Sequence, residues 1–130
     1  MTDRKGMETA TGRIWLRDDG IVEILFKEGA ELTLEDSKQY VENMGRLIAG
    51  NEPAPLLVDL GGLHGHSSEG RAYFAQSDDT RRVASRVALL TESLVSRVLG
   101  NSYLSIKKPR LPTRLFTGRE QAITWLREPL

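Results

Sequence analysis

The sequence predicts an α/β protein with one mixed β-sheet, in which an antiparallel hairpin is followed by parallel strands, flanked by about four helices. Two observations predict this class. Short apolar runs alternate with segments of helical periodicity, which is the pattern of strand–helix–strand units with parallel strands. The dipeptide Asp19-Gly20 separates the first two strand-like runs and indicates a hairpin, because both residues tolerate the backbone angles of a tight turn.

The first half of the chain contains the hairpin and one long helix. Residues 1–11 are polar and aperiodic, so we expect a flexible tail ahead of a single domain over 12–130. Strands are expected over 13–17 and 21–27, with Glu23 on the face opposite Val22, Ile24 and Phe26. Thr33 is expected to cap a helix that Gly50 ends. Its buried stripe comprises Leu34, Ser37, Tyr40, Val41, Met44, Leu47 and Ile48.

Three further strand–helix units are expected in the second half. The apolar runs 56–60 and 86–91 do not alternate, as is typical of strands covered on both faces, and residues 113–116 form a last short strand. Ser67, in preference to Ser68, is expected to cap the helix after the first run, and Ser93 the helix after the second. Thr117 and Glu120 have the spacing of a capping box for the final helix.

Composition limits the classes of function. The chain has 130 residues, of which 39% are hydrophobic and 28% charged, and this suits one globular domain. Eighteen basic residues balance eighteen acidic ones, so we expect no nucleic-acid partner. We expect no membrane insertion and no signal peptide, because no apolar segment is long enough for either. The absence of cysteine excludes disulfides and thiolate chemistry, and we expect a cytoplasmic protein.

The segment 55–74 carries the candidate functional residues. An apolar strand ends at Asp59, a glycine-bearing loop follows, and two serines stand where a helix begins. In α/β proteins this junction lines the usual ligand crevice. We therefore take residues at and near this junction, and at the end of the next strand, as binding or regulatory candidates. They are Asp59, His64, His66, Ser67, Ser68, Arg71, Thr91 and Ser93.

The same residues could also suggest a metal site, a serine hydrolase or a nucleotide-binding loop, and the sequence favours none of these. His64 and His66 could hold a metal beside Asp59, but a stable site needs more ligands and the chain has no other histidine and no cysteine. The local sequence lacks the nucleophile elbow of a serine hydrolase, and its glycines form neither a dinucleotide fingerprint nor a phosphate-binding loop. We expect no catalytic residue, no metal and no cofactor. The basic group around Arg81 and Arg86 is expected to form a solvated helix end.

The order of the elements and one motif resemble the STAS domain of bacterial anti-sigma-factor antagonists. The motif is Val58-Asp-Leu-Gly-Gly-Leu63 leading into Ser67-Ser-Glu-Gly70. In that family a strand ends in Asp-Leu-Ser, and one serine of an Asp-Ser-Ser-Gly helix start is phosphorylated by a partner kinase, which controls partner binding. This chain departs from the pattern with His66 in place of the aspartate and Glu69 before Gly70.

A closer likeness is to an uncharacterised family of small bacterial proteins that are similar to STAS and CRAL-TRIO domains. It implies the fold and no established activity. The segments that carry it are Asp19-Gly20, Pro55–Leu60, Ala88–Leu90, Leu99–Asn101, Lys108-Pro109, Pro112–Phe116 and Ala122–Leu126.

The function that we expect is a non-enzymatic STAS-like regulatory or protein-interaction module that responds to a ligand or to phosphorylation. Its partner would be another protein or a second copy of the chain, as a homodimer. The alternative is a small-molecule or lipid-binding carrier, or a weak enzyme, that uses the crevice at residues 61–68. A shallow surface there would favour the first function, and a deep apolar pocket the second.

Overall fold

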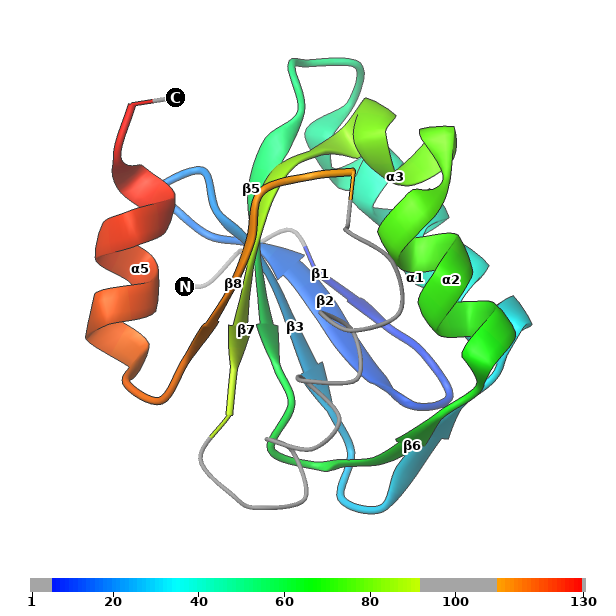
Figure 1. Cartoon of the computed structure of the whole chain (residues 1–130). Helices are drawn as coiled ribbons and strands as arrows, with labels where there is room; N and C mark the ends of the chain where they lie inside the picture. Colours follow the sequence, from blue (N-terminus) through cyan, green and yellow to red (C-terminus); the bar gives the residue numbers. More distant parts are fainter. Residues whose placement is uncertain (1–5, 92–109, 130) are drawn as a thin grey trace.

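The computed structural model describes residues 6–91 and 110–129, and its main feature is a six-stranded sheet (Figure 1). The strand order is β1-β2-β3-β5-β7-β8. The first three strands pair antiparallel, and β3, β5, β7 and β8 pair parallel. The predicted mixed sheet is therefore confirmed. Its strands are β1 (Gly6–Glu8), β2 (Gly12–Leu16), β3 (Val22–Phe26), β5 (Ala54–Asp59), β7 (Ala84–Leu90) and β8 (Thr113–Phe116).

The first strand corrects the expected N-terminal tail. Residues 6–8 were predicted to belong to an irregular tail, but they pair with β2 and place Met7 opposite Ile14. Thr9 explains how the chain turns between the two strands. Its Oγ1 atom accepts a hydrogen bond from the Gly12 backbone N–H at 3.0 Å, and it donates to the Tyr40 hydroxyl at 2.9 Å. Side-chain bonding of this kind ties a polar segment to the helix behind the sheet.

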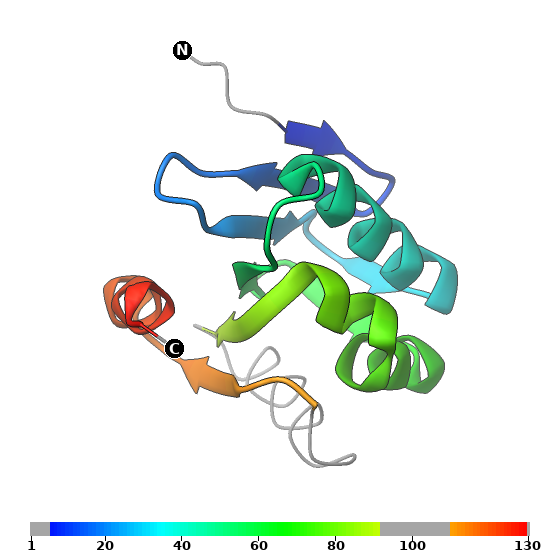
Figure 2. The ribbon, with the colours of Figure 1, turned by 90° about the horizontal axis from the view of Figure 1, so that it is seen from above.

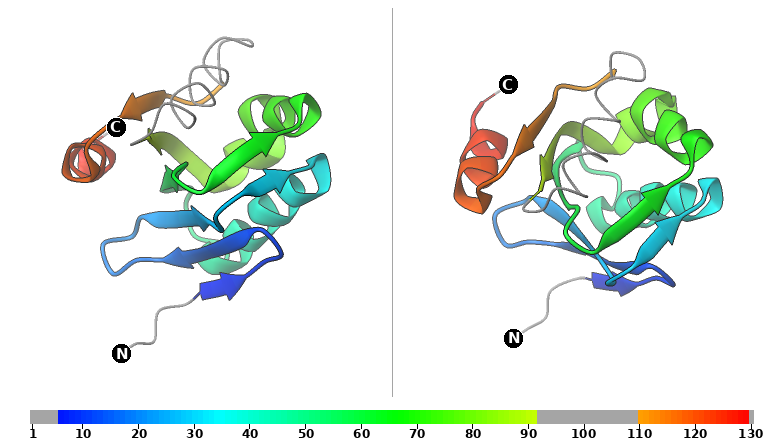
Figure 3. Two further views of the ribbon diagram at one scale, coloured as in Figure 1. Left: turned by 90° about the horizontal axis from the view of Figure 1, so that it is seen from below. Right: turned by 60° about the horizontal axis from the view of Figure 1, so that its bottom comes forward.

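A second, two-stranded sheet was not predicted. Strands β4 (Ala30–Leu32) and β6 (Leu63–His66) pair parallel to each other, apart from the main sheet (Figure 3). The segment 63–66 was interpreted as part of a glycine loop. Close backbone contact explains the glycine that precedes it, because a Cβ atom on Gly62 would lie 2.6 Å from the carbonyl oxygen of Phe26.

Four helices are described, and their ends follow from local hydrogen bonding. They are α1 (Leu34–Ile48), α2 (Ser68–Gln76), α3 (Asp78–Val83) and α5 (Arg119–Arg127). Thr33 caps α1 in a capping box with Asp36, as its position predicted. The predicted capping box at Thr117 is wrong, because α5 begins one residue later, with Gly118 as N-cap and without a side-chain cap bond. The predicted helix from Ser93 lies outside the described residues.

Helices cover both faces of the main sheet, but to different extents (Figure 2). Helix α1 packs on one face, together with α2 and α3, over a large apolar cluster that includes Ile14, Ile24 and Val58. Helix α5 lies on the other face, where Leu57 and Leu126 belong to a smaller cluster, and packs on β5, β7 and β8. None of the described helices is long and apolar enough to cross a membrane.

Candidate functional site

The predicted site comprises the end of β5, strand β6, which pairs with β4, and the start of α2. Ser67 stands at the N-cap of α2, where its Oγ atom accepts a hydrogen bond from the Gly70 backbone N–H at 3.0 Å. The Ser67 backbone N–H donates to the carbonyl oxygen of Leu32 at 2.9 Å, which joins the cap to β4. The preference for Ser67 over Ser68 as the cap is confirmed. Ser68 is the first helical residue, and its side chain is exposed.

His66 is buried beside this cap and bonds to a residue that the sequence did not single out. Its Nε2 atom lies 2.7 Å from the Oγ atom of Ser37 in α1. The Ser37 hydroxyl also lies 3.2 Å from the carbonyl oxygen of Thr33, at the start of α1. Burial, and then the nearby charge of Arg71, lower the pKa of His66 from 6.5 to about 4. The imidazole is therefore neutral at pH 7 and links β6 to α1.

Two further residues fix the start of α2 against this imidazole. Arg71, one of the candidates, donates from Nη1 to the carbonyl oxygen of His66. Gly70 lies so close to α1 and β6 that an added Cβ atom would be 2.8 Å from both His66 Nε2 and Ser37 Oγ. Only glycine allows α2 to pack here without a shift of its neighbours. The structure thus brings His66, Ser67 and Arg71 together, and it adds Ser37 to them.

Asp59 belongs to the opposite face of the sheet. Its neighbours Val58 and Leu60 contribute to the cluster under α1, so the alternation of the strand directs Asp59 towards the α5 side. In register it stands between Leu25 of β3 and Leu90 of β7. Its Oδ1 atom accepts a hydrogen bond from the Gly61 backbone N–H at 2.9 Å, which stabilises the turn after β5. The predicted site is therefore split between two faces.

The remaining candidates are also dispersed. His64 is exposed although His66 is buried, so the two imidazoles do not share one environment. Thr91 is 1% exposed, and its backbone N–H donates to the carbonyl oxygen of Phe116 at 2.9 Å. Ser93 lies outside the described residues. Across residues 6–91 and 110–129, no three histidine, cysteine or acidic side chains come close enough together to hold a metal ion.

The arrangement around His66 acts as a structural link in the described part of the chain. Ser37 is 3% exposed, and its hydroxyl is held between His66 Nε2 and the carbonyl oxygen of Thr33. The cavity that touches this cluster has a volume of about 20 Å³ and is lined mostly by apolar side chains, among them Leu32 and Phe74. That volume admits about one water molecule.

A charged cluster that sequence reasoning missed lies on the α5 side. Glu23 is 3% exposed and forms ion pairs with Arg17 at 3.3 Å and with Arg119 at 2.5 Å. A hollow of about 360 Å³ opens above this cluster. The sequence correctly placed Glu23 on the face opposite Val22, but two arginines cover it there. No local pattern links Glu23 to Arg119, because 96 residues separate them.

Arg86 also differs from its expected place in a solvated helix end. It is 7% exposed in β7, and its Nη1 atom donates to the carbonyl oxygen of Trp125 at 2.6 Å. A cation at this position satisfies a carbonyl of the last turn of α5 and favours the negative end of the helix dipole. Its guanidinium also lies 4.9 Å from the centre of the Trp125 ring.

Comparison with solved structures places this architecture among known folds. An uncharacterised protein of the DUF3478 family from Shewanella loihica PV-4, which has a SpoIIAA-like fold, matches with a TM-score of 0.52 and 16% sequence identity over 97% of each chain. This likeness shows a SpoIIAA-like, and hence STAS-like, fold and nothing about activity. It confirms the fold that the resemblance to STAS domains implied.

Sequence comparison adds the family. A protein of unknown function from Arthrobacter sp. FB24 is 32% identical, over 93% of this chain and 96% of its own, with a TM-score of 0.35. None of the curated proteins matches. Residues 14–129 match the family model described as "Domain of unknown function (DUF7793)". This chain, with its SpoIIAA-like fold, therefore belongs to the DUF7793 family.

Proposed function

We propose that this protein is a non-enzymatic, cytoplasmic regulatory module that binds a protein partner through the corner between β6 and α2. We call this corner the β6–α2 surface and define it by the exposed residues His64, Ser68 and Glu69. The observation that carries the proposal is the contrast between these residues and their neighbours. Ser67, His66 and Arg71 are held in structural hydrogen bonds, whereas Ser68 stands exposed directly after the cap.

A fixed position for Ser68 suits recognition by another protein. The Ser37–His66 bond and the contact of Gly70 with both residues hold the start of α2 against α1. A partner therefore meets a surface that needs little reordering, which lowers the entropy lost on binding. Recognition by shape and hydrogen bonding at such a surface requires no catalytic group.

Ser68 is also the hydroxyl best suited to a charge switch. Phosphorylation adds a charge of about −1.5 to −2, which the N-terminus of a helix tolerates. Ser67 is less suited because its Oγ atom already accepts the Gly70 N–H bond. A charge on Ser68 would alter the β6–α2 surface while Ser67 keeps the cap.

The alternative function, a carrier or weak enzyme with a crevice at residues 61–68, is not favoured by the space beside this segment. The cavity that His66 lines measures about 20 Å³. Sites for small molecules usually enclose several hundred Å³. The exposed residues His64 and Ser68 instead suit contact with another macromolecule.

The test compares partner capture by four forms of the chain in lysate of the source organism, with mass spectrometry as the readout. Ser68→Asp places a charge on the β6–α2 surface, and Ser68→Ala removes the hydroxyl without a charge. Asn51→Asp is the matched control, since residue 51 is exposed beyond the C-terminal end of α1, whereas His66 contacts Ser37 in the first turn of that helix. We expect Ser68→Asp alone to change the amount of a specific captured protein. Equal capture of the same proteins by all four forms would refute the proposal.

A further inference from the structure

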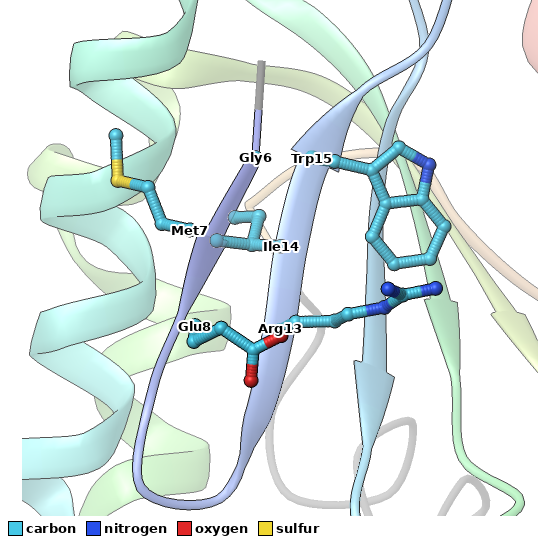
Figure 4. Close-up of a pocket in the computed structure, with 6 residues that line it drawn as sticks. All are labelled: Gly6, Met7, Glu8, Arg13, Ile14 and Trp15. Carbon is cyan, nitrogen blue, oxygen red and sulfur yellow. The ribbon is translucent and has the colours of Figure 1, made fainter. Parts of the chain in front are cut away.

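The part of β1 and β2 that is exposed on the α5 side of the sheet carries a partly exposed tryptophan and two opposite charges, a combination that the β6–α2 surface lacks. We call it the β1–β2 surface and define it by Gly6, Glu8, Arg13 and Trp15 (Figure 4). Gly6, Glu8 and Arg13 are exposed, and Trp15 is partly exposed. Helix α5 packs on β5, β7 and β8, so this end of the face keeps its side chains accessible.

The register of β1 with β2 sets these residues out as two unlike pairs. Gly6 stands opposite Trp15, so the largest side chain of the surface lies beside a residue without one. Glu8 stands opposite Arg13, so a negative charge lies beside a positive one. A surface with this layout is complementary to itself, because each large or charged group has its counterpart on the neighbouring strand.

Neither charge has an ion-pair partner within the described part of the molecule. Glu8 and Arg13 form no ion pair there, although they stand on neighbouring strands. The Arg13 guanidinium lies 4.8 Å from the centre of the Trp15 ring and extends under the indole (Figure 4). This contact holds Trp15 in place and leaves the remaining donors of Arg13 available.

A hollow of about 190 Å³ runs along the two strands and is bounded by these four residues together with Met7 and Ile14. Gly6 and Trp15, which stand opposite each other on the two strands, both line this space. It provides room for a bulky apolar group. Trp15 of a second copy is such a group, and the charges beside it, Glu8 and Arg13, are also opposite in sign.

We infer that the β1–β2 surface is the interface of a twofold dimer of this chain. A rotation of 180° about an axis that runs between β1 and β2, parallel to both, exchanges the two strands. It places Trp15 over Gly6 of the partner subunit and Arg13 over Glu8 of the partner subunit. Both contacts occur twice. The chain carries eighteen positive and eighteen negative residues, so no overall charge repulsion opposes the association.

This inference goes beyond the proposed function, because it concerns a different surface and a different partner. The two can fail separately. Variants at Ser68 leave the β1–β2 surface unchanged, and variants at Glu8 and Arg13 leave the β6–α2 surface unchanged.

Charge reversal tests the dimer directly, with sedimentation equilibrium of the full chain from low to high micromolar concentration. Arg13→Glu sets a second carboxylate against Glu8, and Glu8→Arg sets a second guanidinium against Arg13, so each single variant repels its own copy. We expect each reversal to weaken dimerisation about tenfold or more. A mixture of the two variants restores attraction at both contacts and should dimerise. Glu52→Arg, at an exposed position before β5, is the matched control and should dimerise like the unaltered chain.

Both variants are at exposed strand positions, and the circular dichroism spectrum of each should match that of the unaltered chain, which separates loss of association from loss of folding. Thermal midpoints are compared at a concentration at which the unaltered chain is monomeric, because dimerisation itself raises the midpoint. A monomer at every concentration in the unaltered chain would overturn the inference. A dimer that survives both single reversals would overturn it too, since its interface must then lie elsewhere. Failure of the mixed variants to associate would exclude the pairing of Arg13 with Glu8.

Discussion

The two faces of the main sheet use their polar side chains in different ways. On the α1 side, buried and partly buried polar groups bond to one another across elements, as in the Ser37–His66 pair and the bonds of Tyr40 to Thr9 and Thr11. On the α5 side, charged groups meet at Glu23 and continue into an exposed surface around Trp15. The comparison shows that the predicted site around Ser67 mainly holds α2 in place, whereas the opposite face exposes Glu8 and Arg13 and part of Trp15.

The largest effect that we expect is a loss of stability at low pH, and it comes from His66. The pKa of His66 is about 4 in the folded chain against an ordinary value of 6.5, because burial and then the charge of Arg71 disfavour the imidazolium. The unfolded chain therefore takes up this proton at higher pH than the folded chain. The stability that His66 contributes is complete above pH 6.5 and is lost as the pH falls to about 4, by about 3 kcal/mol.

Urea unfolding at pH 7 and pH 4 measures this loss. The variant His66→Gln should lose less stability between the two pH values than the unaltered chain, because it has no imidazole to protonate. His64→Gln, at an exposed position on the same strand, serves as the control and should lose as much as the unaltered chain. Equal losses for all three forms would show that His66 is not the group responsible.

On the α5 side, the largest expected effect comes from Glu23→Gln. The substitution leaves Arg17 and Arg119 around a neutral side chain, and we expect a loss of about 2–3 kcal/mol of unfolding free energy. Glu42→Gln is the matched control, because Glu42 pairs with Arg46 at the surface with both side chains 61% exposed. That change should alter stability by less than about 0.5 kcal/mol. Equally small losses of unfolding free energy for both variants would contradict a stabilising role for the ion pairs of Glu23.

Gly70→Ala tests the close packing of α2 on the α1 side. The added Cβ atom would lie 2.8 Å from His66 Nε2 and from Ser37 Oγ, so we expect destabilisation of about 1–3 kcal/mol in urea unfolding. Gly45→Ala is the matched helical control. Its Cβ atom would lie at an ordinary 3.5 Å from Val83, and the loss of a helical glycine should stabilise the chain by about 0.5–1 kcal/mol. Stabilisation by both substitutions would contradict the packing at Gly70.

The smallest expected effect compares two helix starts. Ser67→Ala removes the acceptor of the Gly70 N–H bond and should reduce the unfolding free energy by about 1 kcal/mol. Thr117→Ala should change it by less than about 0.5 kcal/mol, because Gly118 is the N-cap of α5 and no side chain bonds there. A larger loss at Thr117 than at Ser67 would reverse our assignment of the two caps.

Sequence reasoning succeeded where structure depends on neighbouring residues. The hairpin follows from Asp19-Gly20, and Gly20 has the positive φ of 86° that such a turn uses. The caps at Thr33 and Ser67 follow from short polar side chains that precede helical periodicity. The apolar run before Asp59 predicted a buried strand, because it lacks the alternation of a half-exposed one.

The features that were missed depend on residues far apart in the chain. Ser37 and His66 are 29 residues apart, and nothing in either segment indicates the other. Strand β1 contains only three residues, and β6 contains a glycine between two histidines, so neither shows the pattern of a strand. Asp59 was grouped with the serines by sequence proximity, but the two-residue period of β5 sends it to the other face.

The division of roles between the two faces is tested most directly by amide hydrogen exchange of the full chain at low and high micromolar concentration. We expect higher concentration to slow exchange in residues 6–16, where the β1–β2 surface would associate, and to leave residues 63–76 unchanged. Slower exchange at residues 63–76, with residues 6–16 unchanged, would contradict this account, because self-association would then use the β6–α2 surface.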